Sequence, residues 1–353
     1  MKKLVLFITF ICWVTMQLFA QRTIDLLAAV GNEQEIRLSE IARDIRYIPL
    51  ETTPECLLHS DGLTVYYGAE YLFISDGNQP GSFYRFTKDG KFLNKIGHVG
   101  QGPEEYIRFT DFIVDENEKN IYLIDNLGGH FVVYSYSGEF IRKLPFKGAY
   151  IQDAALIDHY LFYTNAWFYN NPESYELFLA NRQTGKVIQR VHSSVPEDYR
   201  IKLLLTPPVV YTYNKEVYYK NPLKNVICVL RDGLKQYRKY ILHMGATDNE
   251  NRDDYFNPKK NRNMMDISGI LETDFFLFFW YGYKEKAFWM VCSKKDWTCR
   301  VTDIQNGFID DISGNKGLFN PRYYYSRSEQ YLVAITPDDK GDNNPTVVVA
   351  KLR

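Results

Sequence analysis

Short apolar runs alternate along the chain with turns rich in Gly, Asn and Asp. Four segments share one order: a turn, a glycine, and then a short stretch of apolar and basic residues. They begin at Gly90, Gly138, Gly185 and Gly233, which follow one another at intervals of 47 or 48 residues. Glycine suits such a turn because it adopts a positive φ without a side-chain clash. Self-similarity at this interval predicts stacked supersecondary units or propeller blades.

Each interval divides into four predicted strands. In the first copy they cover residues 63–68, 71–75, 83–87 and 91–96, and a looser fifth copy covers residues 268–303. The second strand of each copy is apolar at almost every position, which is typical of a strand covered on both faces. The fourth strand carries Lys and Arg, which suits an exposed edge that must not recruit another strand.

The sixth copy is one strand short, with strands predicted at 322–326, 331–336 and 346–352. Residues 35–38 and 44–50 form a strand-like stretch that belongs to no copy. If this stretch completes the last copy, the ring closes and its ends are protected. We therefore predict an all-β fold, a six-bladed β-propeller of four-stranded antiparallel blades whose last blade is completed by the N-terminal strand. Residues 22–30 are expected to form a short helix or to be loose.

The first twenty residues follow a different pattern. Lys2 and Lys3 precede an apolar run that closes on Leu18-Phe19-Ala20. This is the charged, apolar and small-residue order of a secretory signal peptide, and it is too short for a membrane span. We expect cleavage near Ala20, a single domain over residues 21–353, no transmembrane segment, and export to the periplasm or the cell surface. Lipid attachment at Cys12 is disfavoured because bulky residues precede it.

The composition excludes some classes of function. The 42 Lys and Arg residues balance 43 Asp and Glu residues, so nothing favours the binding of a polyphosphate backbone, and no nucleic-acid partner is expected. No long amphipathic helix is predicted, which excludes an α/β architecture.

Cys292 and Cys299 flank a turn centred on residues 295–296. In an antiparallel hairpin they would face each other at a separation that a disulfide tolerates, and an exported protein meets an oxidising compartment. The alternative is a pair of reduced cysteines that serve as small apolar residues. The spacing fits no zinc site, because a second Cys or His pair is missing.

Three segments carry a resemblance to a known family: residues 47–52 (YIPLET), 97–106 (GHVGQGPEEY) and 344–349 (NPTVVV). They resemble the six-bladed β-propeller family of exported proteins from Bacteroidetes-type bacteria, which is related in shape to NHL-repeat and TolB-like propellers. The resemblance covers essentially the whole mature chain and implies the fold and export. It implies no substrate, because the family has no settled biochemical role. Many relatives carry a lipoprotein cysteine that this chain lacks.

Propellers bind ligands at one end of the central channel, where the loops between blades meet those between second and third strands. On that face we expect His98, Gln101, Glu104 and Tyr106 to present polar groups to the channel mouth. The alternative for residues 100–103 is a tight inter-blade turn fixed by Gly and Pro.

A second candidate group lies in a long predicted loop. Trp167 and Tyr169 stand beside Asn170 and Asn171, and aromatic rings next to amide side chains can stack on sugars and bind their hydroxyls. The alternative is packing between blades.

Asp76 and Asp125 each end an apolar strand, where an aspartate most often accepts hydrogen bonds from turn N–H groups. The alternative is an axial Ca²⁺ or another divalent ion held by Asp76, Glu104 and Asp125. The histidines are scattered without ligand spacing, and no serine or cysteine nucleophile motif occurs. No catalytic residue and no cofactor are therefore expected.

Two hypotheses of function follow. The favoured one is a non-catalytic, exported propeller that binds a glycan, a peptide or a protein partner at the channel mouth. The alternative is a metal-dependent lactonase, hydrolase or lyase with an axial cation. The first expects ligand binding without turnover, and the second expects a stoichiometric metal ion.

Overall fold

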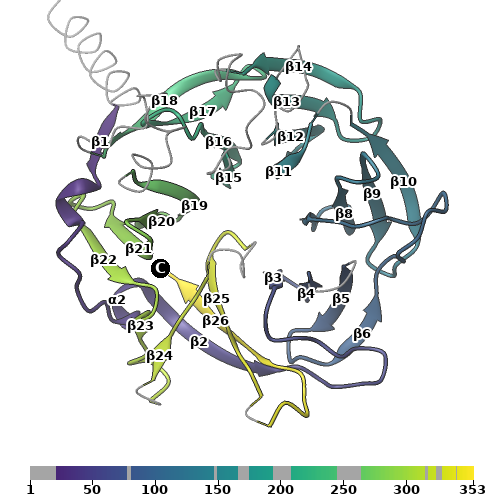
Figure 1. Cartoon of the computed structure of the whole chain (residues 1–353), viewed down its shortest axis with the longest axis horizontal. Coiled ribbons are helices and arrows are strands. Elements are labelled where there is room, and N and C mark those ends of the chain that lie inside the picture. Colours follow the sequence, from purple (N-terminus) through teal and green to yellow (C-terminus); the bar gives the residue numbers. More distant parts are fainter. Residues whose placement is uncertain are drawn as a thin grey trace, which may run out of the picture.

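The computed structural model describes residues 21–77, 81–146, 149–165, 175–193, 208–244, 264–314, 317–322, 328–338 and 340–353. The expected signal peptide lies outside the described residues. Strands account for nearly all of the regular secondary structure of the described chain, and their sheets are arranged as six blades around a central axis (Figure 1). The prediction of a six-bladed β-propeller is confirmed. Among the described helices, none is long and apolar enough to cross a membrane.

Blades 1 to 5 are antiparallel sheets in which consecutive strands pair from the axis outwards. Blade 1 holds β3 (Leu63–Tyr67), β4 (Tyr71–Asp76), β5 (Ser82–Thr87) and β6 (Phe92–Lys95). Blade 2 holds β7 (Asp111–Asp115), β8 (Asn120–Asp125), β9 (His130–Ser135) and β10 (Phe140–Pro145). Blade 3 holds β11 (Ile151–Ile157), β12 (Tyr160–Asn165), β13 (Tyr175–Asn181) and β14 (Val187–His192). Blade 4 holds β15 (Val209–Tyr213), β16 (Glu216–Lys220), β17 (Val226–Arg231) and β18 (Lys235–His243). Blade 5 holds β19 (Asp266–Glu272), β20 (Phe276–Tyr283), β21 (Lys286–Ser293) and β22 (Cys299–Asp303).

Blade 6 joins the two ends of the described chain. Strand β2 (Ala42–Pro49) pairs antiparallel with β26 (Thr346–Leu352), and β26 pairs with β25 (Tyr331–Thr336). The register places Tyr47 opposite Val348. Closure by the N-terminal strand is therefore confirmed. The predicted inner strand at 322–326 lies almost entirely outside the described residues. A short hairpin, β23 (Phe308–Ile309) and β24 (Leu318–Phe319), precedes this blade.

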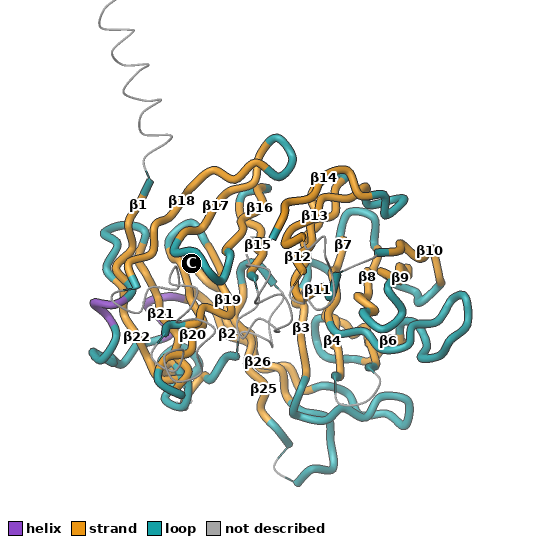
Figure 2. Tube along the Cα trace, turned by 45° about the horizontal axis from the view of Figure 1, so that its top comes forward, coloured by secondary structure: helices purple, strands orange, loops and turns teal. Residues whose placement is uncertain are grey.

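The segment before β2 runs along the outside of three blades, and we call residues 22–41 the N-terminal strap (Figure 2). Its first strand, β1 (Arg22–Asp25), pairs parallel with β18 on the outer edge of blade 4. Isolated bridges then connect Glu33 to Val301 in blade 5 and Arg37 to Ile309. A 3₁₀ turn η1 (Leu27–Ala29) lies between β1 and the first bridge, and a one-turn helix α2 (Leu38–Ile41) connects the second bridge to β2.

The sequence-based expectation for the strap was partly wrong. Residues 22–30 begin with a strand, because Ile24 and Leu26 are fully buried against blades 4 and 5. The strand expected at 35–38 is reduced to the bridge at Arg37, because Leu38 and Ile41 are buried as one helical turn.

Among the described residues the hydrophobic core is divided into six clusters, and each cluster fills the space between two neighbouring blades. Between blades 1 and 2, for example, Phe73 and Phe83 pack with Phe112 and Val132. The second strands are covered on both faces, and every residue of β8 is buried. The apolar second strands predicted from the sequence arise from this double coverage.

The repeated glycines occupy left-handed turns between third and fourth strands. Gly90 has a φ of 85° and Gly138 a φ of 92°. A Cβ at Gly90 would lie 2.2 Å from the carbonyl oxygen of Pro49 in the preceding blade. Glycine is therefore required both by the turn and by the close approach of the neighbouring blade.

Candidate functional site

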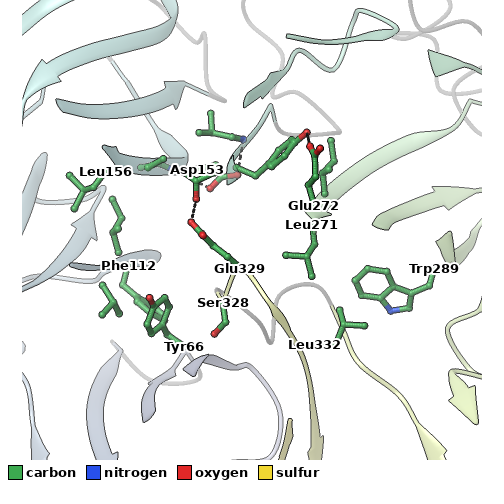
Figure 3. Close-up of a pocket in the computed structure, with 18 residues that line it drawn as sticks. Tyr66, Phe112, Asp153, Leu156, Leu271, Glu272, Trp289, Ser328, Glu329 and Leu332 are labelled. Atoms are coloured by element: carbon green, nitrogen blue, oxygen red, sulfur yellow. Dashed lines mark hydrogen bonds between the residues drawn. The ribbon is translucent and has the colours of Figure 1, made fainter. Parts of the chain in front are cut away.

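A cavity of about 180 Å³ lies on the propeller axis (Figure 3). Its walls come mainly from the first strands of blades 1 to 5 and from the segment that leads into β25, with Trp289 of β21 and Leu332 of β25 added. The lining combines apolar side chains with three carboxylates, Asp153, Glu272 and Glu329, and with the hydroxyl groups of Tyr66, Tyr211, Thr212 and Ser328. No Lys or Arg occurs among the described lining residues. The cavity is therefore acidic, and it suits a ligand that presents hydrogen-bond donors.

Glu272 ends β19, and its side chain is fully buried. The hydroxyl groups of Tyr211 and Tyr240 donate to its two oxygens at 2.8 and 2.7 Å, and the Lys294 ammonium group lies 2.6 Å away. Burial lowers the pKa of Lys294, and the charge of Glu272 opposes that change. A carboxylate with this many partners is held in one position.

Asp153 and Glu329 have partners of other kinds. Asp153 accepts hydrogen bonds from the backbone N–H groups of Ala154 and Val210, at 3.0 Å each, which joins the inner strands of blades 3 and 4. Glu329 is exposed and accepts a hydrogen bond from the hydroxyl of Thr212. In Figure 3, the Glu329 side chain extends into the cavity from the blade 6 side.

Tyr66 completes the polar rim from blade 1. Burial raises the pKa of its hydroxyl well above the usual range, and the negative charges of Glu116 and Glu329 contribute. A phenol is protonated at neutral pH, so this hydroxyl can donate a hydrogen bond to a ligand.

Most of the polar groups lie toward one end of the channel, whereas Asp153 is near the start of β11 and lies toward the other end. Tyr66, Thr212 and Glu272 stand at or next to the last residue of their strands, and Glu329 shortly precedes β25. This is the end where first strands turn into second strands. The sequence-based prediction placed the site at the opposite end, where the loops between blades converge.

The predicted group from the loop at 97–106 does not line the cavity. Tyr106 is fully buried, and its hydroxyl donates to the carbonyl of Gly81 at 2.9 Å. His98, Gln101 and Glu104 are exposed. The loop is fastened by a bridge between Val99 and Tyr106 and by the Glu105 carboxylate, which accepts from the N–H of Gly102 at 2.8 Å. These contacts favour the alternative of a tight inter-blade turn.

Asp76 and Asp125 hold the loops that lead into blades 1 and 2. Asp125 accepts from the backbone N–H groups of Ile107 and Gly128 at 2.7 and 2.8 Å. Asp76 lies 3.4 Å from the ring of His59. In the described part of the chain, no three His, Cys, Asp or Glu side chains gather as a metal site would require. Asp76, Glu104 and Asp125 thus do not form the predicted ligand set.

The other sequence-based candidates divide into two groups. Trp167 and Tyr169 lie outside the described residues. Cys292 and Cys299 are joined in a disulfide, with their Cα atoms 4.1 Å apart across the hairpin of β21 and β22.

The cavity residues were missed because their signal is weak. Asp153 interrupts an otherwise mostly apolar inner strand, and Glu272 ends another. A search for charged residues within first strands would have found both. Glu329 has no comparable signal, because it lies between predicted strands.

Comparisons with known proteins agree with this architecture. A family described as "Domain of unknown function (DUF4934)" matches residues 21–346. A protein from Bacteroides fragilis NCTC 9343 that is described as exported has a similar structure, with a TM-score of 0.69, 16% identity, and coverage of 95% of this chain and 100% of that one. A DUF4221 member from Bacteroides vulgatus has a TM-score of 0.53 and 11% identity, with 88% and 97% covered. No match was found among curated protein sequences. These identities establish a shared fold alone.

Proposed function

The chain belongs to the DUF4934 family, whose description names no activity. From the geometry of the axial cavity, we propose that the protein is exported and binds a ligand without transforming it. The ligand presents hydroxyl or amino groups, as a glycan, a peptide or a protein segment does. The observation that carries this proposal is the acidic cavity, with carboxylates from the inner strands of blades 3 and 5 and from the segment that leads into β25.

The partners of these carboxylates support binding in preference to catalysis. Glu272 is held by two tyrosines and a lysine, and Asp153 by two backbone N–H groups. Fixed acceptors of this kind orient the donors of a ligand. Glu329 is exposed, so its carboxylate is accessible to a ligand that enters the cavity.

Export is supported by two observations. The first twenty residues have the pattern of a secretory signal peptide. The similar Bacteroides fragilis protein is described as exported.

The test is a binding screen of the purified mature chain against glycan and peptide arrays, followed by titration of each hit. Glu329→Gln removes one charge without touching a buried contact, and we expect it to weaken binding about tenfold, as the loss of a charge-assisted hydrogen bond does. Glu139→Gln, at an exposed turn of blade 2, is the matched control and should bind like the wild type. The proposal would be contradicted by ligands that bind Glu329→Gln as tightly as the wild type, or by ligands that the protein converts chemically.

A further inference from the structure

A second cavity, of about 340 Å³, lies at the junction of blades 4 and 5. Its lining residues are Arg22, Tyr213, Asn214, Lys239, Tyr240, Glu272, Lys294 and Trp297. Glu272 also lines the axial cavity, so the Glu272–Lys294 ion pair lies between the two. The second cavity is therefore distinct from the axial cavity, and the two differ in charge.

The charge of this cavity is positive. Three cations, Arg22, Lys239 and Lys294, line the cavity with one carboxylate, Glu272, which Lys294 and two tyrosines already bind. A second carboxylate, Asp274, accepts a hydrogen bond from the hydroxyl of Tyr213 at 2.9 Å and also acts on Lys294, so the cations still outnumber the acids. Lys239 is close enough to Lys294 that its charge helps to lower the pKa of Lys294. Within the described part of the chain, Arg22 and Lys239 form no ion pair. An anion in the cavity would relieve this repulsion.

Trp297 departs from the repeat at this cavity. The turn between third and fourth strands carries glycine in the first four blades, in a left-handed conformation. The same pair of backbone hydrogen bonds closes the turn at Gly185 in blade 3 and the turn at Trp297 in blade 5. Trp297 has a φ of 64°, which an L-residue with a bulky side chain rarely adopts. Strained residues of this kind cluster at ligand sites.

The hairpin holds Trp297 in place. The disulfide between Cys292 and Cys299 closes the hairpin on both sides of the turn that carries Lys294 and Trp297. The centroids of the Trp297 and Tyr240 rings lie 5.7 Å apart, and the guanidinium of Arg22 lies 5.0 Å from the centroid of the Trp297 ring. The Lys294 ammonium group lies 4.0 Å from the ring of Tyr213. Cations and aromatic rings therefore share one wall.

We propose that the cavity between blades 4 and 5 is a second binding site, for a carboxylate carried on a sugar ring, as in a hexuronate unit of an acidic glycan. Arg22 and Lys239 bind the carboxylate, since both are cations without an ion-pair partner in the described chain. The rings of Tyr213 and Trp297 contact the C–H face of the sugar, and Asn214 bonds its hydroxyls.

The test is calorimetric titration of the mature chain with trigalacturonate, with maltotriose as the uncharged match. We expect trigalacturonate to bind and maltotriose not to bind. Arg22→Gln, Lys239→Gln and Trp297→Gly should each weaken binding about tenfold or more, as the loss of a charge-assisted or stacking contact does. Trp297→Gly should fold, because four other blades carry glycine at this turn.

Lys235→Gln, on the same strand as Lys239 but outside the cavity, is the matched control and should bind like the wild type. The proposal is overturned if trigalacturonate fails to bind at millimolar concentration, or if Lys239→Gln binds as tightly as the control. A triglutamate peptide that binds as tightly as trigalacturonate would overturn the assignment to a sugar.

Discussion

At the scale of single residues, the buried guanidinium of Arg182 joins blades 2 and 3. It pairs with Asp115, which is also buried, and lies 2.7 Å from a carboxylate oxygen of Glu118. It also donates to the carbonyl of Asp158 at 2.7 Å. Arg182 holds the pKa of Glu118 below its usual value through a hydrogen bond.

Arg182→Ala would leave Asp115 buried without a counter-charge. We expect the free energy of unfolding to fall by about 3 kcal/mol or more, measured by urea denaturation. Arg231→Ala, which removes a partly exposed pair with Glu216, is the control and should cost about 1 kcal/mol or less. If both variants lower the free energy of unfolding by the same amount, burial does not determine how strongly the Arg182–Asp115 pair stabilises the fold.

Lys88 offers a prediction about pH. Its ammonium group lies 3.1 Å from the centroid of the Tyr67 ring, and burial lowers its pKa to about 8 from the ordinary value of 10.5. Between these two pH values the unfolded chain binds more protons than the folded chain, so this residue's contribution to stability rises with pH. The wild type should therefore gain stability relative to Lys88→Met between pH 8 and pH 10. A difference that stays constant over this range would contradict the lowered pKa.

At the scale of the elements, the N-terminal strap connects blades 4, 5 and 6 from outside. In β1, only Ile24 is buried, while Arg22, Thr23 and Asp25 are exposed. The strand also covers the outer edge of β18, which would otherwise present unpaired backbone groups.

Ile24→Ala should therefore lower the free energy of unfolding by about 3 kcal/mol, as truncation of a fully buried aliphatic side chain does. Thr23→Ala, one residue earlier and exposed, is the matched control and should change little. Thermal denaturation of both variants is the measurement. If the two midpoints coincide, β1 does not pack on blade 4 in solution.

The elements also show what the sequence could and could not predict. Glycine intervals and apolar second strands located the blades, because both follow from local turn geometry and from coverage on two faces. Strand β1 escaped prediction, because four residues with one buried position carry no periodic signal. The hydrogen bond between Tyr211 and Glu272 spans 61 residues of sequence, so the axial cavity became visible only when the blades were placed.

At the scale of the whole molecule, the six apolar clusters leave the axis free for polar groups. The core lies between blades, so side chains on the inner strands are released from packing on the side that faces the channel. That freedom explains how Asp153 and Glu329 are accommodated at the centre of a β-rich protein. The cavity between blades 4 and 5 arises differently, where a tryptophan replaces the turn glycine at a blade junction.

The pairing of β2 with β26 also sets the order of events during biosynthesis. Residues 42–49 leave the ribosome long before their partner strand at 346–352. A nascent polypeptide therefore keeps an open edge on blade 6 until residues 346–352 have been made. The ring closes only after blades 1 to 5 have been synthesised.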